Sequence, residues 1–392
     1  MSQQDVYIVS CSRTPIGCFR GCLSSLSATD LGSLAIKSAI EKIGLPSDEV
    51  DEVFMGHVLQ GSCGQAPARQ AALKAGISKT TPCTTVNKVC ASGMKSVVFG
   101  SQSIKLGEND VVVCGGMESM SNVPFYLKRG EVPYGGASLL DGLVFDGLTD
   151  TFNKCHMGNC TEKLAKDYKL TREDQDEYAI SSYKRSEAAS KNGVLKREIA
   201  PVTIAGVRGK PAVVIDEDEE FKKIDFEKMR KINPVFQREG GTITAANAST
   251  LSDGAAACVL MSPSALKKYN LTPLAKVVAY ADGGVDPVDF GIAPAFAVRK
   301  LLKRSGKDKS EIALWEVNEA FSAVALANIK DLGLDPSRVN VNGGAVSLGH
   351  PLGMSGARIV NSLAMNLPKG QLGVAAICNG GGGASAILIE KL

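Results

Sequence analysis

Short runs of β-branched and apolar residues alternate with helical patterns toward both ends of the chain. Strands are predicted at residues 5–10, 52–55, 111–114 and 373–377, and a helix is predicted at about residues 28–43. Buried strands that alternate with helices are typical of layered α/β proteins. Because the runs are apolar on both faces, we expect the strands to be largely parallel.

The middle of the chain follows a different pattern. From about residue 119 to residue 241 the sequence is charged, rich in turns and locally basic, as at residues 221–225 and 228–231. Such a segment has too few periodic apolar positions to form a core of its own. It therefore predicts a more solvated subdomain inserted between two α/β regions.

The two flanking regions resemble each other. Residues 35–44 align with residues 297–306, and residues 90–94 align with residues 350–354. The period is too long for a solenoid, so it indicates a duplicated α/β unit with a pseudo-twofold axis. Cys90 and His350 then occupy equivalent positions in the two halves.

Composition and charge exclude several classes of function. The chain has 392 residues, enough for two or three domain-sized units, with 44 Lys+Arg against 41 Asp+Glu. A formal net charge of +3 predicts no sequence-independent binding to nucleic acid. No apolar run approaches the ~18 residues that a membrane span needs. The 41 glycines and 5% aromatic residues favour close helix–sheet packing over a β-sandwich.

The cysteines predict a reduced protein without a structural zinc site. Of the eleven cysteines none forms a CxxC pair, and neither Cys18 with Cys22 nor Cys155 with Cys160 has a second ligand pair nearby in sequence. Loosely spaced cysteines of this kind are typical of intracellular proteins, where most of them pack. The chain holds three histidines, which limits the candidates for imidazole chemistry.

Cys90 and His350 are the candidates for nucleophilic catalysis. Cys90 follows a strand-like run at residues 84–89 and precedes a helical pattern, and His350 opens a second such turn, with Pro351 predicted at the first helical position. A helix N-terminus stabilises a thiolate. A lone cysteine is more often a packing residue, but the matching repeat positions favour a thiol and an imidazole aimed at one point.

Two further segments have unusual polar or flexible residues. Four glycines at residues 380–383 follow a buried strand and allow a ligand or another backbone to approach closely, with Cys378 as a second thiol beside them. No dinucleotide or Walker fingerprint accompanies them. Residues 315–321 predict a strand that leads into a helix, where buried Asn318 and Glu319 need partners or a function.

Five segments together resemble the motifs of the thiolase family, in order along essentially the whole chain. They are residues 87–95, 115–121, 318–321, 349–353 and 378–382. Within that family the chain is most similar to the potassium-dependent, mitochondrial-type acetoacetyl-CoA thiolases, the acetyl-CoA acetyltransferases. The resemblance implies the thiolase fold, in which duplicated α/β halves form five α-β-α-β-α layers with an inserted loop domain.

The same resemblance implies a division of the chain into three parts. Residues 1–118 with 250–271 would form the N-terminal half, and residues 272–392 the C-terminal half. Residues 119–249 would form the loop domain that binds CoA and potassium.

The implied reaction is the reversible Claisen condensation of two acetyl-CoA molecules to acetoacetyl-CoA and CoA. Cys90 would carry the acetyl group, and His350 would lower the pKa of its thiol and help to bind the thioester oxygen of the second acetyl-CoA. Cys378 would exchange the α-proton, and Asn318 would hold a water that completes this oxyanion site. The N–H groups of Cys90 and Gly380 would form the other oxyanion hole.

The resemblance also implies substrate and ion ligands. Potassium would be bound by Tyr183 and by four carbonyl oxygens, whose neutrality suits a monovalent cation; these belong to Ala245, Ala246, Ala248 and Val346. Lys223 and Lys228 would hold the CoA nucleotide, although charged runs of this kind are often only solvated. The residues implied in CoA or substrate binding are His156, Met157, Tyr183, Lys223, Asp225, Lys228, Ser249, Phe290 and Phe321.

One position departs from the family pattern. Gly291 stands where relatives that cleave 2-methylacetoacetyl-CoA have proline, next to a retained Phe290. Acceptance of a 2-methyl branch therefore stays open. His57 has no matching role and is interpreted as structural.

Several alternatives remain open at this point. They are a longer-chain 3-ketoacyl-CoA thiolase, a ketoacyl or chalcone synthase relative, a catalytically silent acyl-CoA-binding paralogue and a nucleotide-binding dehydrogenase. The resemblance further implies a homotetramer built as a dimer of dimers, no covalent cofactor, and acetyl-CoA, acetoacetyl-CoA and CoA as partners. It favours a mitochondrial location, with the presequence absent from this sequence, over a cytoplasmic one.

Overall fold

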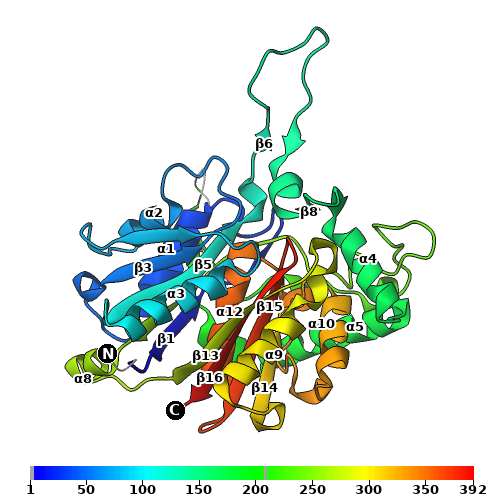
Figure 1. Cartoon of the computed structure of the whole chain (residues 1–392). Coiled ribbons are helices and arrows are strands. Elements are labelled where there is room, and N and C mark those ends of the chain that lie inside the picture. Colours follow the sequence, from blue (N-terminus) through cyan, green and yellow to red (C-terminus); the bar gives the residue numbers. More distant parts are fainter. Residues whose placement is uncertain (1–3, 207–208, 210) are drawn as a thin grey trace.

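The computed structural model describes residues 4–206, 209 and 211–392 (Figure 1). Its central feature is one mixed sheet in the order β4-β3-β5-β12-β1-β13-β16-β15-β14, with the short β2 (Gly17–Cys18) paired to β12. The bounds are β1 (Tyr7–Arg13), β3 (Glu52–Gly56), β4 (Cys83–Val86), β5 (Val111–Ser119), β12 (Ser252–Met261), β13 (Ala275–Gly284), β14 (Ile312–Val317), β15 (Leu372–Asn379) and β16 (Gly383–Lys391).

The sheet consists of two halves with the same topology, which confirms the predicted duplication. In the N-terminal half β3 runs parallel to β4 and β5, and β12 pairs antiparallel with β5 and β1. In the C-terminal half β14 runs parallel to β15 and to a bridge at Val339, and β16 pairs antiparallel with β15 and β13. The halves join where β1 pairs with β13 at Tyr7–Lys276 and Ile8–Ala275.

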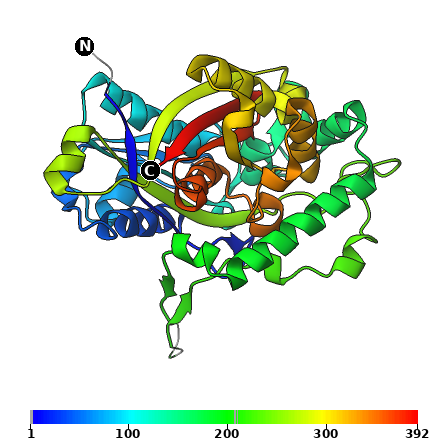
Figure 2. The same cartoon turned by 90° about the horizontal axis from the view of Figure 1, so that it is seen from below.

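Helices form three layers around the two half-sheets. The central layer contains α3 (Ser92–Leu106) and α12 (Leu352–Asn366), whose apolar faces share one core with both halves. Outside the N-terminal half lie α1 (Ala28–Glu41) and α2 (Pro67–Lys74). Outside the C-terminal half lie α9 (Ala293–Ser305) and α10 (Ser322–Leu332). Figure 2 shows α12 between the outer helices, as the five-layered thiolase fold requires.

The two central helices meet through glycine at their N-terminal ends. A Cβ atom on Gly93 of α3 would lie 2.6 Å from the carbonyl oxygen of Gly353 of α12, and one on Gly353 would lie 2.7 Å from the carbonyl oxygen of Met117. Any side chain at either position would force these backbones apart. The close approach places Cys90 and His350, each two residues before its helix, at the same end of the helix pair.

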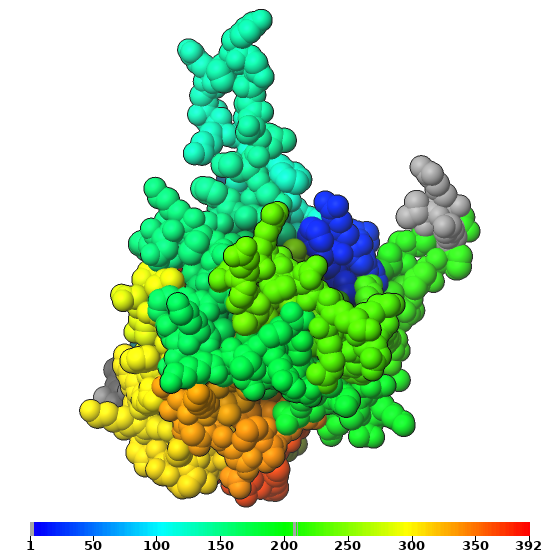
Figure 3. Space-filling model, turned by 90° about the vertical axis from the view of Figure 1, so that its right-hand side faces the viewer, coloured from blue at the N-terminus to red at the C-terminus, as the bar shows by residue number. Residues whose placement is uncertain are grey.

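Between β5 and β12 the chain leaves the sheet, as the inserted region predicts. This excursion contains α4 (Met157–Asp167), α5 (Arg172–Lys191), α6 (Val194–Glu198) and α7 (Phe226–Met229). Three two-stranded ribbons complete it: β6 (Phe125–Tyr126) with β7 (Leu140–Asp141), β8 (Thr149–Asp150) with β9 (Cys155–His156), and β10 (Val202–Ile204) with β11 (Val213–Ile215). The loop between β6 and β7 projects far from the body (Figures 1 and 3).

Two expectations about local structure were wrong. The sheet is mixed and not largely parallel. β15 and β16 are joined by a short glycine turn, which can only connect antiparallel strands. β12 likewise runs antiparallel to β5. Pro351 is the N-cap of α12 and not its first helical residue. The remaining short helices are α8 (Pro263–Tyr269) and α11 (Ala345–Leu348).

Within the part of the chain that the structure describes, no helix combines the length and the apolar character that a membrane span requires.

Candidate active site

A cavity of about 600 Å³ lies where the N-terminal ends of α3 and α12 meet the excursion. Cys90, His350 and Gly380 come from the two halves of the core, and most of the remaining wall comes from the excursion and is apolar. The lining residues are Cys18, Phe19, Cys90, Met120, Val144, Gly147, Leu148, His156, Met157, Glu220, Val235, Phe236, Thr244, Ala245, Ala248, Ser249, Thr250, Leu251, Phe290, Ala320, Phe321, His350, Leu352 and Gly380.

Cys90 is held by a strained backbone. The preceding Val89 has φ +47°, a left-handed conformation that is costly for a β-branched residue. Lys88 anchors this turn to the other half, because its Nζ donates to Asp282 Oδ1 at 2.6 Å and to Ser385 Oγ at 2.8 Å. Strain that the surroundings enforce in this way is characteristic of functional turns.

The Cys90 thiol is neutral in this site. Burial raises its pKa to about 12, although the N–H groups of Gly380 and of Cys90 itself favour the thiolate. The expectation that His350 lowers this pKa stays a prediction. Two N–H groups that stabilise charge at one point are nevertheless the donors that an oxyanion hole needs.

His350, which lines the cavity, has an unprotonated Nε2 in this structure. The hydroxyl of Ser355 donates to the carbonyl oxygen of Pro351 at 2.9 Å, so its oxygen accepts from His350 Nδ1 at 2.6 Å. This assignment leaves Nε2 unprotonated, 3.5 Å from Nδ2 of Asn318. Burial and the Arg358 charge lower the pKa of His350 to about 3, so the imidazole is a neutral base.

The low pKa of His350 predicts a dependence of stability on pH. The unfolded histidine, with an ordinary pKa near 6.5, binds a proton that the folded one refuses, so stability is lost as the pH falls from about 6.5 toward 3. Between pH 7 and pH 5 we expect His350 to contribute about 2 kcal/mol of this loss. Urea unfolding of the wild type and of His350→Gln at both pH values measures it. An equal loss in both proteins would contradict the prediction.

Cys378 and Asn318 lie directly behind the cavity wall. Cys378 is the penultimate residue of β15, is fully buried, and belongs to the same cluster as Met157, Phe290 and Phe321, which line the cavity. Burial and the nearby Cys90 thiol raise the pKa of Cys378, so it too is a neutral thiol. Oδ1 of Asn318 is buried without a hydrogen-bond partner among the described residues, which is the position of an acceptor that a water can satisfy.

His156 and Met157 form the wall opposite the core. His156 caps α4 by accepting the N–H of Gly158 at Nδ1, 3.0 Å away, and its ring stacks on Phe236 with centroids 4.6 Å apart. Burial lowers the pKa of His156, so this ring is neutral as well. Ser249 turns its hydroxyl to the carbonyl of Ala320 at 2.8 Å. These contacts shape an uncharged part of the cavity wall.

Gly291 leaves room that a neighbouring side chain fills. A Cβ atom at this position would lie 2.6 Å from Cδ2 of Leu164, and the Gly291 carbonyl accepts a hydrogen bond from Asn328 at 2.7 Å. Leu164 and Phe290 belong to the same buried cluster. Leu164 therefore packs directly against Gly291, and the space beside this glycine is filled.

Of the residues implied in CoA binding, Tyr183 does not line the cavity, and neither do the three from the segment at residues 223–228. Lys223 and Lys228 are exposed and form ion pairs with Glu219 at 2.6 Å and with Asp225 at 3.0 Å. Asp225 also caps α7. Their segment starts beside Glu220, which does line the cavity, so they follow its rim on the surface.

The residues implied in potassium binding fit a cation ligand set. Tyr183, Ala246 and Val346 share one buried cluster, and Ala245 and Ala248 line the cavity. Across the described residues, no hydrogen bond ends on the carbonyl oxygens of Ala245, Ala246, Ala248 or Val346. Carbonyl oxygens that lack donors need a cation or water as partner.

Sequence reasoning missed the residues that support the catalytic groups. Glu118 is fully buried and accepts the N–H groups of Val58, Leu59 and Gly353 at 2.9–3.1 Å, so it ties the start of α12 to the N-terminal half. His57 lies 3.2 Å from it; burial alone would lower the pKa of His57, but the Glu118 carboxylate raises it to about 9. The sequence feature that could have identified Glu118 is a carboxylate inside an otherwise apolar strand.

Comparison with known proteins gives close relatives over the whole chain. Acetyl-CoA acetyltransferase A, mitochondrial, of Xenopus laevis is 62% identical over 388 residues, which cover 99% of this chain and 92% of the relative. The mitochondrial acetyl-CoA acetyltransferase of Homo sapiens is 60% identical over 389 residues, covering 99% and 91%.

Solved structures share the same architecture. The Acat5 thiolase from Ascaris suum in complex with coenzyme A superposes with a TM-score of 0.95 at 53% identity, covering 99% of this chain and all of the other. The Bacillus anthracis acetyl-CoA acetyltransferase has a TM-score of 0.96 at 39% identity, with both chains fully covered. Residues 6–264 match the thiolase N-terminal domain and residues 271–391 match the thiolase C-terminal domain. The resemblance in the motifs is thereby confirmed, and the chain belongs to the thiolase family.

Proposed function

We propose that this acyltransferase is an acetyl-CoA C-acetyltransferase, which condenses two acetyl-CoA molecules to acetoacetyl-CoA and CoA and catalyses the reverse thiolysis. The observation that carries the proposal is the convergence of Cys90, His350, Cys378 and two N–H donors at one end of an apolar cavity. Relatives that bear the acetyl-CoA acetyltransferase name support the same activity.

In the first half-reaction Cys90 attacks the thioester carbon of acetyl-CoA. Nε2 of His350 takes the thiol proton as the new S–C bond forms, and the N–H groups of Cys90 and Gly380 stabilise the oxyanion. The C–S bond to CoA then breaks, and the CoA thiolate leaves with the proton. A neutral His350 is the form that can accept this proton.

In the second half-reaction the acetyl group moves to carbon. Nε2 of His350 first takes the thiol proton of Cys378, and the Cys378 thiolate then removes the α-proton of a second acetyl-CoA. The enolate oxygen accepts hydrogen bonds from the new Nε2–H of His350 and from a water held at Oδ1 of Asn318. The enolate carbon attacks the acetyl carbon, the bond from that carbon to Cys90 Sγ breaks, and Cys90 leaves as a thiol after taking the proton from His350. The walls near these groups exclude bulk water, which strengthens each donor.

The cavity wall sets the substrate class. His156, Met157, Ser249, Phe290 and Phe321 surround the thioester with uncharged groups, which suits a pantetheine arm and a short acyl chain. Lys223 and Lys228 on the adjacent surface supply positive charge for the CoA phosphates, and Asp225 orients Lys228. Phe290, packed by Leu164 at Gly291, closes the channel beside the acyl group.

Potassium binding belongs to the same proposal. Tyr183 and the carbonyls of Ala245, Ala246, Ala248 and Val346 would hold the ion, which supplies positive charge that fixes the loop at residues 244–248. Two of these residues line the cavity, so an ordered loop gives a better defined acyl-CoA site.

Assembly and location follow from the relatives and from two exposed features. The β6–β7 loop exposes Phe125, Leu127, Val132, Tyr134 and Leu139, and β4 ends the sheet with an open edge. Apolar loops and open edges are surfaces that a second copy covers. A homotetramer built from dimers uses both. We place the enzyme in mitochondria, as its relatives are named, with the cytoplasm as the alternative.

The function is tested by thiolysis of acetoacetyl-CoA with free CoA, followed through loss of the enolate absorbance in potassium or sodium chloride. We expect turnover in both salts and a higher rate in potassium, because the ion orders the loop at residues 244–248. Tyr183→Phe should lose the potassium effect and retain the sodium rate, whereas Tyr168→Phe, which removes a partly buried hydrogen bond to Asp331 outside the proposed ion site, should keep the potassium effect.

Other outcomes identify the alternatives. Turnover of longer 3-oxoacyl-CoA substrates without acetoacetyl-CoA would indicate a longer-chain 3-ketoacyl-CoA thiolase. Binding of CoA without turnover of any substrate would indicate a silent acyl-CoA-binding paralogue. An equal rate in both salts would contradict the potassium proposal and leave the acetyltransferase proposal intact.

A further inference from the structure

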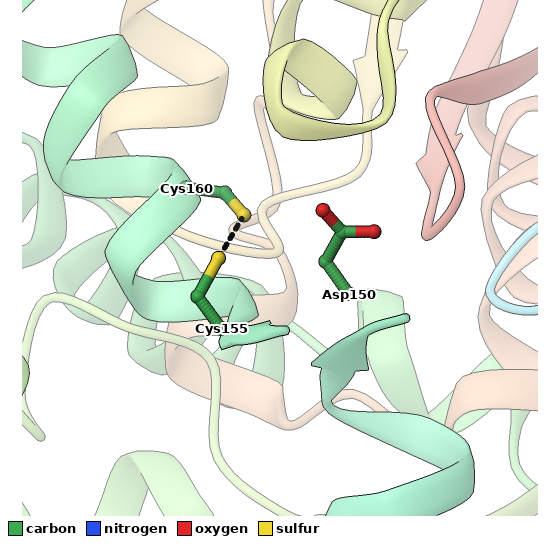
Figure 4. Close-up of side chains that lie close together, drawn as sticks. All are labelled: Asp150, Cys155 and Cys160. Atoms are coloured by element: carbon green, nitrogen blue, oxygen red, sulfur yellow. Dashed lines mark hydrogen bonds between the residues drawn. The ribbon is translucent and has the colours of Figure 1, made fainter. Parts of the chain in front are cut away.

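Asp150, Cys155 and Cys160 gather their donor atoms beside the cavity (Figure 4). One carboxylate oxygen and the two sulfurs all lie within 4.8 Å of one another, and the two Sγ atoms are 3.5 Å apart. None of the three residues lines the cavity, and none takes part in the proposed reaction. In the sequence the two cysteines had no further ligand nearby, and the fold supplies one in Asp150.

We propose that this cluster is a binding site for a thiophilic divalent cation of the zinc class. Two thiolates and a carboxylate are a donor set that zinc accepts. Zn–S bonds of about 2.3 Å at the tetrahedral angle place two sulfurs about 3.8 Å apart, close to the observed spacing. A disulfide needs sulfurs at about 2.05 Å, so at 3.5 Å the two thiols are free and in hydrogen-bonding contact, and both sulfurs are available as ligands.

The ligands are oriented before an ion arrives. Asp150 is buried, and its carboxylate accepts the N–H groups of Phe152 and Asn153, each at 3.2 Å, and the Asn153 side chain at 2.5 Å. Pairing of β8 with β9 sets Asp150 opposite Cys155, and Cys160 lies within the first turns of α4. Outer hydrogen bonds of this kind raise metal affinity. Cys155 is partly exposed, which leaves an entry path and room for a water as fourth ligand.

An ion at this site would connect the ribbon to the helix. His156 and Met157, which line the cavity, lie between Cys155 and Cys160 in the chain. A cation bound to both cysteines therefore stiffens the turn that carries this wall. Binding of a thiophilic metal ion would therefore affect the wall of the acyl channel, whichever acyl group the enzyme transfers.

Cadmium titration of the full chain under reducing conditions tests the site. We expect one bound ion per chain, with the ultraviolet charge-transfer band of a cadmium dithiolate, and displacement of cadmium by zinc. Cys155→Ser should weaken binding by about 10-fold or more and reduce the band, and Asp150→Asn should weaken binding to a similar degree while the band remains. The partly exposed position of Cys155 keeps this variant folded, which thermal unfolding without metal verifies.

Matched variants separate this site from the other thiols. Cys63→Ser removes a half-buried cysteine elsewhere and should leave the titration unchanged, and a Cys90→Ser/Cys378→Ser protein should retain the full band. Loss of the band in that protein, or its survival in Cys155→Ser, would place the metal on the reactive thiols and overturn the proposal. Absence of any cadmium binding, or a Cys155–Cys160 disulfide in the purified protein, would overturn it as well.

Discussion

Replacement of Cys90 by serine is expected to lower kcat for condensation and thiolysis by about 10⁴-fold or more. The hydroxyl is a weaker nucleophile toward a thioester, and an acetyl ester on oxygen is a poorer acyl donor than a thioester. The later C–C bond step therefore loses its driving force as well. Steady-state kinetics with acetoacetyl-CoA measure the loss, and mass spectrometry of the acetyl-CoA-treated protein measures the missing adduct.

The Cys90 variant has a close internal control. Cys63→Ser makes the same change at a half-buried thiol outside the cavity and should retain both activity and the acetyl adduct. Because the hydrogen bonds of Lys88 to the other half anchor the Cys90 turn, serine at Cys90 should leave the fold unchanged. An acetyl group found on another residue of an active Cys90→Ser protein would refute the assigned nucleophile.

Replacement of Cys378 by alanine should separate the two half-reactions. We expect kcat for condensation to fall by about 10²–10⁴-fold, the range for loss of a general acid–base group. Acetylation of Cys90 uses His350 and the Gly380 N–H, so it should persist. Mass spectrometry should show the acetyl-Cys90 adduct accumulating in Cys378→Ala, and exchange of acetyl-CoA with labelled CoA should continue.

A different pattern would reassign the proton transfer. If Cys378→Ala lost acetylation and condensation to the same degree, Cys378 would be needed for the cavity wall, since it packs with Met157, Phe290 and Phe321. If it kept full condensation activity, the α-proton would have to pass to another base, and the arrangement would approach that of synthases with a single cysteine.

Much of the fold could be predicted from the sequence, because the patterns that indicate it lie within short segments of the chain. The helices after Cys90 and His350 begin two residues after the predicted catalytic groups, and each is marked by apolar positions on one face and by a glycine near its start. The repeat between the halves required only aligned segments of the same chain. These features depend on neighbours in the sequence, where periodicity carries the information.

The missing parts depend on partners far apart in the chain. The antiparallel strands β12 and β16 are apolar runs that look the same as parallel ones. Glu118 reaches Gly353 of the opposite half, and Asp150 reaches two cysteines only because β8 pairs with β9. Ser355 fixes the tautomer of His350, but nothing in the sequence distinguishes it from other serines. Only the start of α12 brings its hydroxyl to Nδ1 of His350.

The glycine contact between α3 and α12 determines how far apart the backbones that carry Cys90 and His350 lie. At Gly93 and Gly353 main-chain atoms of one helix face those of the other with no side chain between them. Main-chain atoms have no rotamers, so this contact fixes the spacing of the two helices more rigidly than packed side chains would. The positions of Cys90 and His350 at the start of the helices follow from that spacing. The residues between β5 and β12 can therefore change the cavity wall, and with it the acyl groups that are admitted, while the spacing of the reacting pair stays constant.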